Sequence, residues 1–435
     1  MSTDLDFDSS ADFLPATNEN KPDFDEIDVS AKTFWLQTFE EREKSFAILR
    51  RERPVSWQRP IEDAVLPDPD DPGYWAIVRH ADIAAISRQN ELFISGQGIL
   101  FDLMPPAMLE MSQSIVSMDD PKHANLRKLI SAAFTPKQVK RMEDKILGAA
   151  AELVDRIATR GHAEAVAEVT TPLPVMVVCD IFGVPRDQWE DAGIFAMRVT
   201  NWADPVVLQG QPADEVVVEA CVNLHAIAEE MIADRRENPT DDLLQSLIDA
   251  EVDGKQLDDF EIQAFFTLMI CAGTDTTKHS LGHTLLGLTK YPEQRAWLME
   301  DFDGRIDVAI DEFLRYATPI MNFRRTVKRE TTFGGVRMMP GDKVVMFYGS
   351  GNWDTDVFEN PHNLILDRSP NPQLSFGGGG VHFCLGNQLA KSMLRAMVHQ
   401  VLTRLPDYQA YDAQMAETNF MRAFNSLQLK FTPES

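Results

Sequence analysis

The stretch that we expect to decide the fold reads Ser375-Phe376-Gly377-Gly378-Gly379-Gly380-Val381-His382-Phe383-Cys384-Leu385-Gly386. Its consecutive glycines lack Cβ atoms, so their backbone can take unusual dihedral angles and lie close to a flat ligand. An apolar pattern with helical period then runs from Gly386 to Leu405. Cys384 therefore precedes a helix, where free N–H groups and the helix dipole stabilise a thiolate, the metal-binding form. A flat ligand and a thiolate together indicate haem iron with one axial cysteine.

Two other interpretations of this loop stay open at this point. A glycine run before a helix can bind a phosphate group. A single buried cysteine is often only a small hydrophobic side chain. The loop by itself does not decide between these interpretations and a haem site.

The same loop resembles the haem-binding loop of the cytochrome P-450 monooxygenases. The matching residues are Phe376, Gly377, Gly380, His382, Cys384 and Gly386. The resemblance implies that Cys384 binds the iron of haem b (iron protoporphyrin IX) and that the others surround this cofactor. Phe376 lies eight residues before Cys384, one more than in the commonest bacterial form. The additional glycine resembles a variant found among bacterial members that act on sterol-like or terpenoid substrates.

The composition predicts one globular unit. The chain has 435 residues, of which 44% are hydrophobic, and no linker, repeat or low-complexity block follows residue 31. The four cysteines are widely spaced and form no CxxC or Cys/His metal pattern, which favours a reducing cytosol. No apolar run reaches the roughly 18–20 residues of a membrane span, and no signal peptide is recognisable. We therefore expect a cytoplasmic protein without a membrane partner.

The charge distribution divides the chain into a short acidic segment and the main unit. The net charge of −27 argues against nucleic acid as a partner, because phosphate binding needs a basic surface. Residues 1–30 carry nine Asp and Glu side chains and one basic residue, Lys21. We expect this segment to be flexible and solvated at least as far as Asp25, and the enzyme domain to span residues 31–435.

The residue patterns predict a mainly α fold with a minor β region, and the resemblance implies the single-domain cytochrome P-450 fold. Helices are expected at 32–53, 80–88 and 257–290, and short strands at 74–78 and 166–169.

The long central helix contains a polar turn in an apolar surrounding. Ala272 and Gly273 are small enough for a ligand to approach, and Asp275 and Thr276 add a carboxylate and a hydroxyl that are costly to bury without partners. These groups could simply satisfy one another or bend the helix. The turn resembles the oxygen-activation site of the family. The resemblance implies catalytic roles for Asp275 and Thr276 in a water relay that delivers protons for O–O cleavage.

Four polar side chains are expected to bind the haem propionates. His123 and Arg127 are four residues apart and share one helical face, a pattern that is often only a surface pair. The family has an equivalent His-x-x-x-Arg at the propionates, and the resemblance implies the same role for Arg325. Gln373 stands where relatives commonly carry a histidine, and its amide can still donate one neutral hydrogen bond.

A second motif is structural. Glu312 and Arg315 are three residues apart on one helical face, and such pairs are frequent by chance and mostly exposed. The motif resembles the buried Glu-x-x-Arg of the family, and the resemblance implies that Arg368 completes the network.

Residues 122–145 are locally basic, with seven Lys and Arg against Glu143 and Asp144. In the family this part lies on the face of the thiolate ligand, where a basic surface would attract an acidic ferredoxin. A merely solvated helical face explains the same pattern equally well.

The candidate substrate pocket is apolar and comes from four parts of the chain. Residues 93–118 are irregular and rich in methionine, which suits either an adaptable lid or a partly buried surface loop. The expected pocket residues are Phe101, Met104, Leu268, Ala272, Ile320, Met321, Asn322 and Phe424. They favour a terpenoid, steroid, alkyl or aromatic substrate, with Asn322 available to orient one polar group.

These motifs together predict a haem-thiolate monooxygenase that hydroxylates an apolar small molecule. It should use O2 and two electrons from a ferredoxin with its NAD(P)H-dependent reductase, and we expect a monomer. Two alternatives are a peroxide-driven haem-thiolate enzyme and a non-catalytic haem sensor. Asp275 and Thr276 count against both, since neither function needs protons delivered to dioxygen.

Overall fold

The computed structural model describes residues 14–17, 21–65, 68–101, 114–131, 134, 136–252 and 255–434. Its helices of five or more residues are α2 (Phe39–Glu52), α3 (His80–Ser87), α5 (Lys122–Ser131), α6 (Pro136–Ala158), α7 (Pro172–Phe182), α8 (Trp189–Thr200), α10 (Ala213–Glu237), α11 (Leu243–Ile248), α12 (Asp259–Lys290), α13 (Pro292–Glu300), α14 (Phe302–Ala317), α15 (Tyr348–Asn352) and α16 (Asn387–Arg404). Shorter helices are α1 (Lys32–Trp35) and α9 (Pro205–Leu208). The fold is mainly helical with small sheets, as the sequence predicted.

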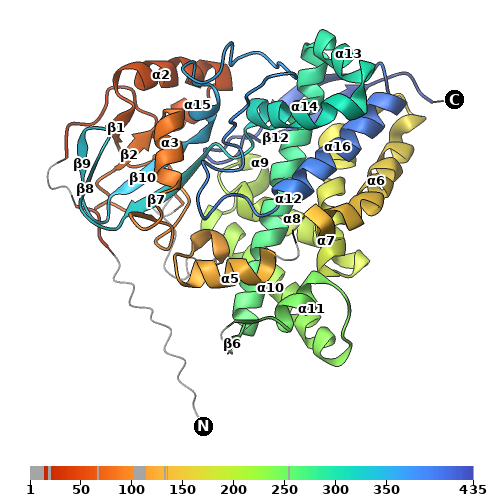
Figure 1. Ribbon diagram of the computed structural model, residues 1–435, viewed down its shortest axis with the longest axis horizontal. Coiled ribbons are helices and arrows are strands. Elements are labelled where there is room, and N and C mark those ends of the chain that lie inside the picture. Colours follow the sequence, from red (N-terminus) through yellow and green to blue (C-terminus); the bar gives the residue numbers. More distant parts are fainter. Residues whose placement is uncertain are drawn as a thin grey trace.

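Helix α12 is the axis of the helical part. It begins with a capping box, in which Asp258 and Glu261 each bind the backbone N–H of the other. Its flanks are apolar almost all round, so it is covered by α7, α8 and α10 on one side and by α14 and α16 on the other. Figure 1 shows α12 passing through the middle of these helices. Its polar turn is consequently held inside the protein.

A sheet of five strands forms a separate layer beside the helices (Figure 1). Its strands are β1 (Val55–Gln58), β2 (Tyr74–Ile77), β10 (Lys343–Phe347), β7 (Asn322–Val327) and β3 (Phe93–Ile94), in that order across the sheet. All neighbouring pairs are antiparallel except β10 and β2. Smaller sheets are formed by β11 (Gln409–Met415), β12 (Phe424–Lys430) and β4 (His162–Glu164), by β8 (Thr331–Phe333) and β9 (Val336–Met338), and by β5 (Glu251–Val252) and β6 (Lys255–Gln256).

Two expected elements differ from the structure. The helix expected over residues 32–53 is interrupted between α1 and α2, because Thr38 forms a capping box with Glu41 and begins a new helix. The strand expected at 166–169 is wrong: Val166–Thr170 is one π-helical turn that leads into α7. Its β-branched residues are buried against the helices, so burial outweighs their strand propensity.

Part of the acidic N-terminal segment is packed against the sheet. The Lys21 ammonium binds both carboxylate oxygens of Asp342 at 2.5 Å, and Asp25 accepts a 2.7 Å bond from Arg53 Nε. A solvated segment was expected as far as Asp25; Lys21 and Asp25 are instead anchored, whereas Pro22, Asp23 and Phe24 between them are exposed. The domain boundary at residue 31 stays a prediction. Within the described ranges, no helix combines the length and the apolar character that crossing a membrane requires.

Candidate functional site

The glycine loop between β10 and α16 is shaped by its contact with α3. Gly377, Gly379 and Gly380 have φ values of +94°, +94° and +77°, which L side chains rarely adopt. A Cβ atom on Gly380 would lie 2.2 Å from the carbonyl oxygen of Ser87, and one on Gly378 would lie 2.9 Å from Cα of Ala84. Gly378 and Gly380 thus allow the loop to lie against α3, and the expected closeness of the loop to a flat ligand stays a prediction.

Cys384 follows this loop and points its thiol towards the start of α16. Its N–H donates to the carbonyl of Phe376 at 3.0 Å, and the N–H of Gly386 donates to its sulfur. Burial raises the pKa of the Cys384 thiol to about 11, although the Gly386 N–H and the Arg127 charge both favour the thiolate. A bound metal cation would supply the missing positive charge and displace the thiol proton.

Two imidazoles and two guanidiniums gather beside this cysteine. The rings of His123 and His382 are 4.4 Å apart between centroids, and His382 Nε2 lies 3.2 Å from Ser95 Oγ. Burial, assisted by the charges of Arg325, His123 and Arg127, lowers the pKa of His382 to about 2. Burial also lowers the pKa of His123. Both rings are thus neutral at pH 7.

The same cluster has unused hydrogen-bonding capacity. Among the described residues, neither buried ring nitrogen of His123 has a hydrogen-bond partner; Nδ1 lies 3.5 Å from Asp120 Oδ1, too far for a normal bond. Arg127 donates to the carbonyl of Phe383 at 2.6 Å, and Arg325 Nη1 donates to the carbonyl of Arg324. Buried donors and positive charges around one thiol match a flat ligand that carries carboxylates at its edge. The residues present therefore fit a haem with its propionates.

Gln373 does not join this cluster. Its Nε2 is 3.4 Å from Asp311 Oδ1, and its Oε1 accepts a 2.7 Å bond from the N–H of Ser375. The amide is therefore occupied within its own loop and with α14. Its expected contact with a propionate is not supported by these bonds.

The polar turn of α12 contains a tightly bonded carboxylate. Asp275 is 2% exposed and accepts hydrogen bonds from Thr200, from Asn201 Nδ2 at 3.1 Å and from Lys278 Nζ at 3.1 Å. The hydroxyl of Thr276 donates to the carbonyl of Ala272 at 2.8 Å. The Asp275 carboxylate is thus hydrogen-bonded to the end of α8, whereas the Thr276 hydroxyl is hydrogen-bonded to a carbonyl of its own helix.

Gly273 in the same turn is required by packing. A Cβ atom there would lie 2.8 Å from a methyl group of Val178 on α7. This contact brings α7 close to the polar turn. A ligand was expected to approach closely at Gly273, and in the structure helix α7 lies there instead.

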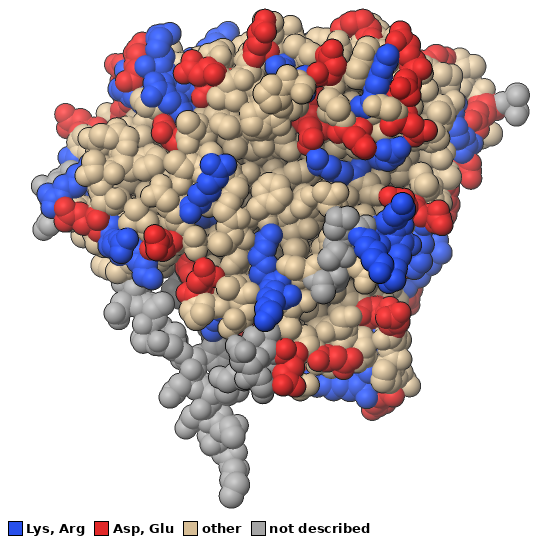
Figure 2. Space-filling view, in the orientation of Figure 1, with Lys and Arg blue, Asp and Glu red and all other residues tan. Residues whose placement is uncertain are grey.

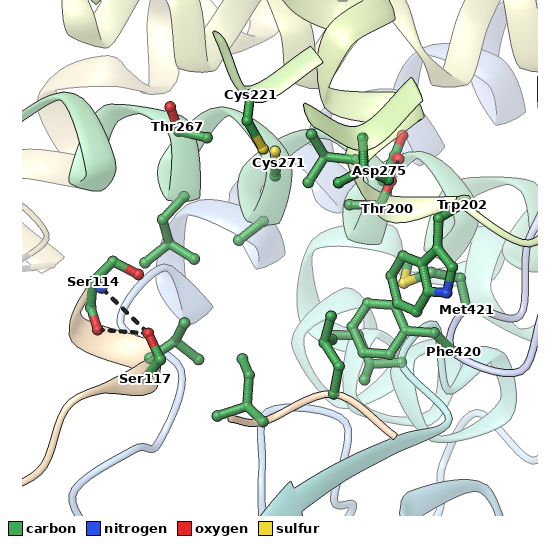
Figure 3. A pocket seen from close by; sticks show the side chains of 18 of the residues that line it. Ser114, Ser117, Thr200, Trp202, Cys221, Thr267, Cys271, Asp275, Phe420 and Met421 are labelled. Atoms are coloured by element: carbon green, nitrogen blue, oxygen red, sulfur yellow. Dashed lines mark hydrogen bonds between the residues drawn. The ribbon is translucent and has the colours of Figure 1, made fainter. Parts of the chain in front are cut away.

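An apolar cavity of about 200 Å³ adjoins the polar turn. Figure 3 shows its side chains, with Trp202, Phe420 and Met421 at one end and Ser114, Ser117 and Thr267 at the other. The expected residues that line it are Leu268, Ala272, Asp275, Thr276 and Ile320. Faces of α8, α10 and α12 form part of its walls, and Cys221 of α10 and Cys271 of α12 point towards each other (Figure 3).

Four of the expected pocket residues lie elsewhere. Phe101 packs between Trp35 and Phe347, and Met321 is buried in the same cluster, on the opposite side of the chain from Ile320. Asn322 is fully buried and donates to the carbonyl of Asn419 at 2.7 Å.

Phe424 is also outside the cavity, because it packs on α12 against Gly282 and His283. Met104, the remaining expected pocket residue, lies outside the described residues.

The side chains that close the cavity at one end were not among the pocket residues expected from the sequence. Trp202 and Phe420 pack with ring centroids 5.2 Å apart, and Phe323 approaches Phe420 at 5.6 Å. Met421 is paired with Ile320 in an isolated β-bridge. The sequence contained a clue to these residues. Apolar residues lie just before Ala423, and Trp202 lies just after α8. Both segments are connections between elements of secondary structure.

The Glu312 network is present, with Glu312 and Arg315 fully buried and Arg368 at its partly exposed edge. Arg315 binds both oxygens of Glu312 at 2.7 Å, and Arg368 Nε binds one of them at 3.0 Å. Arg315 also donates to the carbonyls of Asn352 and Pro361. The network joins α14 to the segment that precedes the cysteine loop, so it holds the loop in place without contacting the cavity.

Basic side chains cover the surface next to the cysteine loop. Lys137, Lys140, Arg141 and Lys145 on α6 are exposed. Figure 2 shows Lys and Arg side chains gathered where α6 lies, and further ones over α5. Since Arg127 of α5 binds the carbonyl of Phe383, this surface is continuous with the loop that carries the cysteine.

Comparisons with known proteins agree with this geometry. A model of the cytochrome P450 family matches residues 75–406. The methyl-branched lipid omega-hydroxylase of Mycobacterium tuberculosis is 36% identical over 394 residues, covering 88% of this chain and 90% of that protein. The steroid C26-monooxygenase of Mycolicibacterium smegmatis is 32% identical over 368 residues, covering 83% and 84%.

A solved structure is also similar over almost its whole length. A cytochrome P450 of Mycobacterium marinum in complex with pseudoionone superposes with a TM-score of 0.93. It is 47% identical, and the match covers 95% of this chain and 100% of that one.

Proposed function

The chain belongs to the cytochrome P450 family and is a monooxygenase, and on this premise we propose that it hydroxylates an apolar small molecule with O2. The observation that carries the proposal is the juxtaposition of an apolar cavity and an acid–alcohol turn, since Ala272, Asp275 and Thr276 belong to both. A cofactor-dependent oxidation of a C–H bond needs such a dry site with one controlled source of protons.

The haem of this family supplies the redox chemistry that cleaves dioxygen when it is bound. We propose that it is haem b, that Cys384 binds its iron and that His123, Arg127 and Arg325 bind its propionates. His382, Phe376 and Gly386 surround the thiol on the loop. Asp275 and Thr276 hold and pass the protons that the reaction consumes, and the apolar cavity orients the substrate and excludes water.

The substrate class follows from the lining of the cavity. Trp202, Phe420 and Met421 form an aromatic and sulfur-containing end without charge, and Leu268 and Ile320 continue it. Such walls suit a terpenoid, steroid or alkyl chain. The names of the relatives, which refer to methyl-branched lipid, steroid and pseudoionone, support this class.

We propose that the electrons come from a ferredoxin with an NAD(P)H-dependent reductase. The exposed basic residues of α6 give an acidic partner a complementary surface. Arg127 connects that surface to the loop of Cys384, so a partner bound there would lie next to the proposed iron ligand. We further propose a cytoplasmic location, since all four cysteines are free. A monomeric state is proposed from the sequence analysis alone.

Turnover of a reconstituted system tests the proposal. The haem-loaded chain, a ferredoxin, its reductase and NADPH are incubated with pseudoionone or testosterone, and products are identified by mass spectrometry with ¹⁸O₂. We expect one ¹⁸O atom in the product and dependence on the ferredoxin. Product with hydrogen peroxide only would favour a peroxide-driven enzyme. Haem loading and ligand binding without product from either oxidant would favour a sensor.

A further inference from the structure

The carboxylate of Asp275 is held by three donors from two different elements. Thr200 is the last residue of α8, Asn201 follows it, and both bind Oδ2 of Asp275. Lys278, one turn further along α12, binds Oδ1 at 3.1 Å. An ionised carboxylate only accepts hydrogen bonds, so this arrangement fixes both of its oxygens.

Lys278 has a single carboxylate partner. It is 4% exposed, and within the described ranges its ammonium is paired with Asp275. A buried ammonium needs a countercharge, so the lysine and the acid depend on each other. Lys278 therefore restricts where Asp275 can turn.

One of the residues that bind Asp275, Thr200, also faces the cavity. Val199, Thr200 and Trp202 line its wall, and Figure 3 shows Asp275 and Thr200 meeting at the edge of this wall. A ligand that fills this end of the cavity touches the segment that holds the carboxylate. Contact with the ligand and orientation of the acid are consequently linked through α8.

One acceptor of this cluster is unused. Asn201 is 3% exposed, and in the part of the chain that the structure describes its buried Oδ1 has no hydrogen-bond partner. A buried amide oxygen without a donor is unfavourable, so the cluster can accept one more donor next to Asp275. A water molecule of the proton relay or a polar group of a ligand matches this requirement.

We propose that Thr200, Asn201 and Lys278 are positioning residues that orient Asp275 for proton delivery and make its orientation depend on how the cavity is filled. The inference rests on the proposed function of Asp275. It adds that the fraction of electrons that reach the product is set partly by α8, which contributes no group to the reaction itself.

Two variants remove the bonds one at a time. Thr200→Val removes the hydroxyl and keeps the shape, and Lys278→Met removes the charge and keeps most of the length. Lys278→Arg restores a cation. Thr284→Val is the matched control, because this buried threonine of α12 donates only to the carbonyl of Ser280 and lies outside the cavity lining.

The first measurement is hydrogen exchange of the haem-loaded, ligand-free chain, followed by mass spectrometry of peptides that cover residues 193–204. We expect exchange at the end of α8 to become roughly tenfold faster in Thr200→Val and to stay unchanged in Thr284→Val. Unchanged exchange in Thr200→Val would contradict the link between α8 and Asp275. This measurement does not depend on turnover.

The second measurement is the ratio of product to NADPH consumed, with pseudoionone as the probe. We expect this ratio to fall about two- to fivefold in Thr200→Val and about tenfold in Lys278→Met, with recovery in Lys278→Arg. Faster exchange with an unchanged ratio would overturn the positioning role. Absence of product from the unsubstituted chain would instead count against the proposed function. The exchange data would still show whether Asp275 holds the end of α8.

Discussion

The region around Cys384 and the cavity beyond α12 are built in different ways. The cysteine, its glycine loop and the first turn of α16 are contiguous in the chain, and backbone contacts such as Cys384 N–H to Phe376 hold them. The cavity is enclosed by segments that are far apart in sequence, including Leu100, Thr200 and Phe420. The geometry of a contiguous motif follows from the spacing of its residues along the chain. The lining of a cavity depends instead on how whole elements are placed.

This difference explains what the sequence could predict. The positions of Cys384, His382, His123 and Arg325 follow from short motifs, and the structure brings them together. The long helix at 257–290 was predicted within two residues of its observed start, because its capping residues precede a clear apolar pattern.

The errors concern side chains whose direction depends on tertiary structure. Ile320 and Met321 are adjacent, and only the first lines the cavity, because neighbouring residues of an extended segment face opposite sides. Phe424 was expected in the cavity, and instead Phe420 and Met421 are there. A composition pattern shows that such a segment is apolar, but it does not show which residue turns inward.

The largest effect should come from Glu312→Ala, which leaves Arg315 and Arg368 buried without their countercharge. We expect a loss of about 3–5 kcal/mol in the free energy of unfolding and a low haem content. Urea denaturation and the ratio of haem to protein absorbance measure both. Glu330→Ala is the control, since its pair with Arg337 is exposed and its removal should change neither quantity. A normally loaded, stable Glu312→Ala protein would show that the network does not support the cysteine loop.

Gly380→Ala tests whether the loop must contact α3. The new Cβ would lie 2.2 Å from the carbonyl oxygen of Ser87, in a backbone with φ of +77°. We expect about 2–3 kcal/mol of destabilisation, measured by urea denaturation. Gly335→Ala is a matched control, because φ is +83° there and nothing lies within 4 Å of the added Cβ. Equal losses in the two variants would mean that the backbone conformation, and not the contact with α3, requires glycine.

Thr276→Ala tests whether the hydroxyl beside the cavity takes part in proton delivery. Without the hydroxyl, we expect NADPH consumption to continue while product falls about tenfold and hydrogen peroxide rises. Product and peroxide are quantified in the same reaction. Thr274→Ala is the control, since its hydroxyl donates to the carbonyl of Ile270 and does not line the cavity. Full coupling in Thr276→Ala would argue against a proton relay through this residue.

The smallest effects are expected from two phenylalanines near the C-terminus. Phe420→Leu removes a ring from the end of the cavity, and the affinity for pseudoionone should fall about fivefold to tenfold, or about 1 kcal/mol. Phe424→Leu removes a ring that packs on His283 and should lower the stability while leaving the affinity unchanged. Spectral titration and urea denaturation separate the two. A lower affinity in Phe424→Leu together with an unchanged affinity in Phe420→Leu would show that Phe424, and not Phe420, lines the pocket.

The central claim is that Cys384 binds the haem iron through its thiolate, and the ferrous–CO spectrum of Cys384→Ala tests it most directly. The unsubstituted chain should give the red-shifted Soret band of a thiolate-ligated haem, and so should the control Cys271→Ala, whose thiol lines the cavity. We predict that Cys384→Ala, loaded with haem, lacks this band. A Cys384→Ala protein that keeps the red-shifted band would contradict the account.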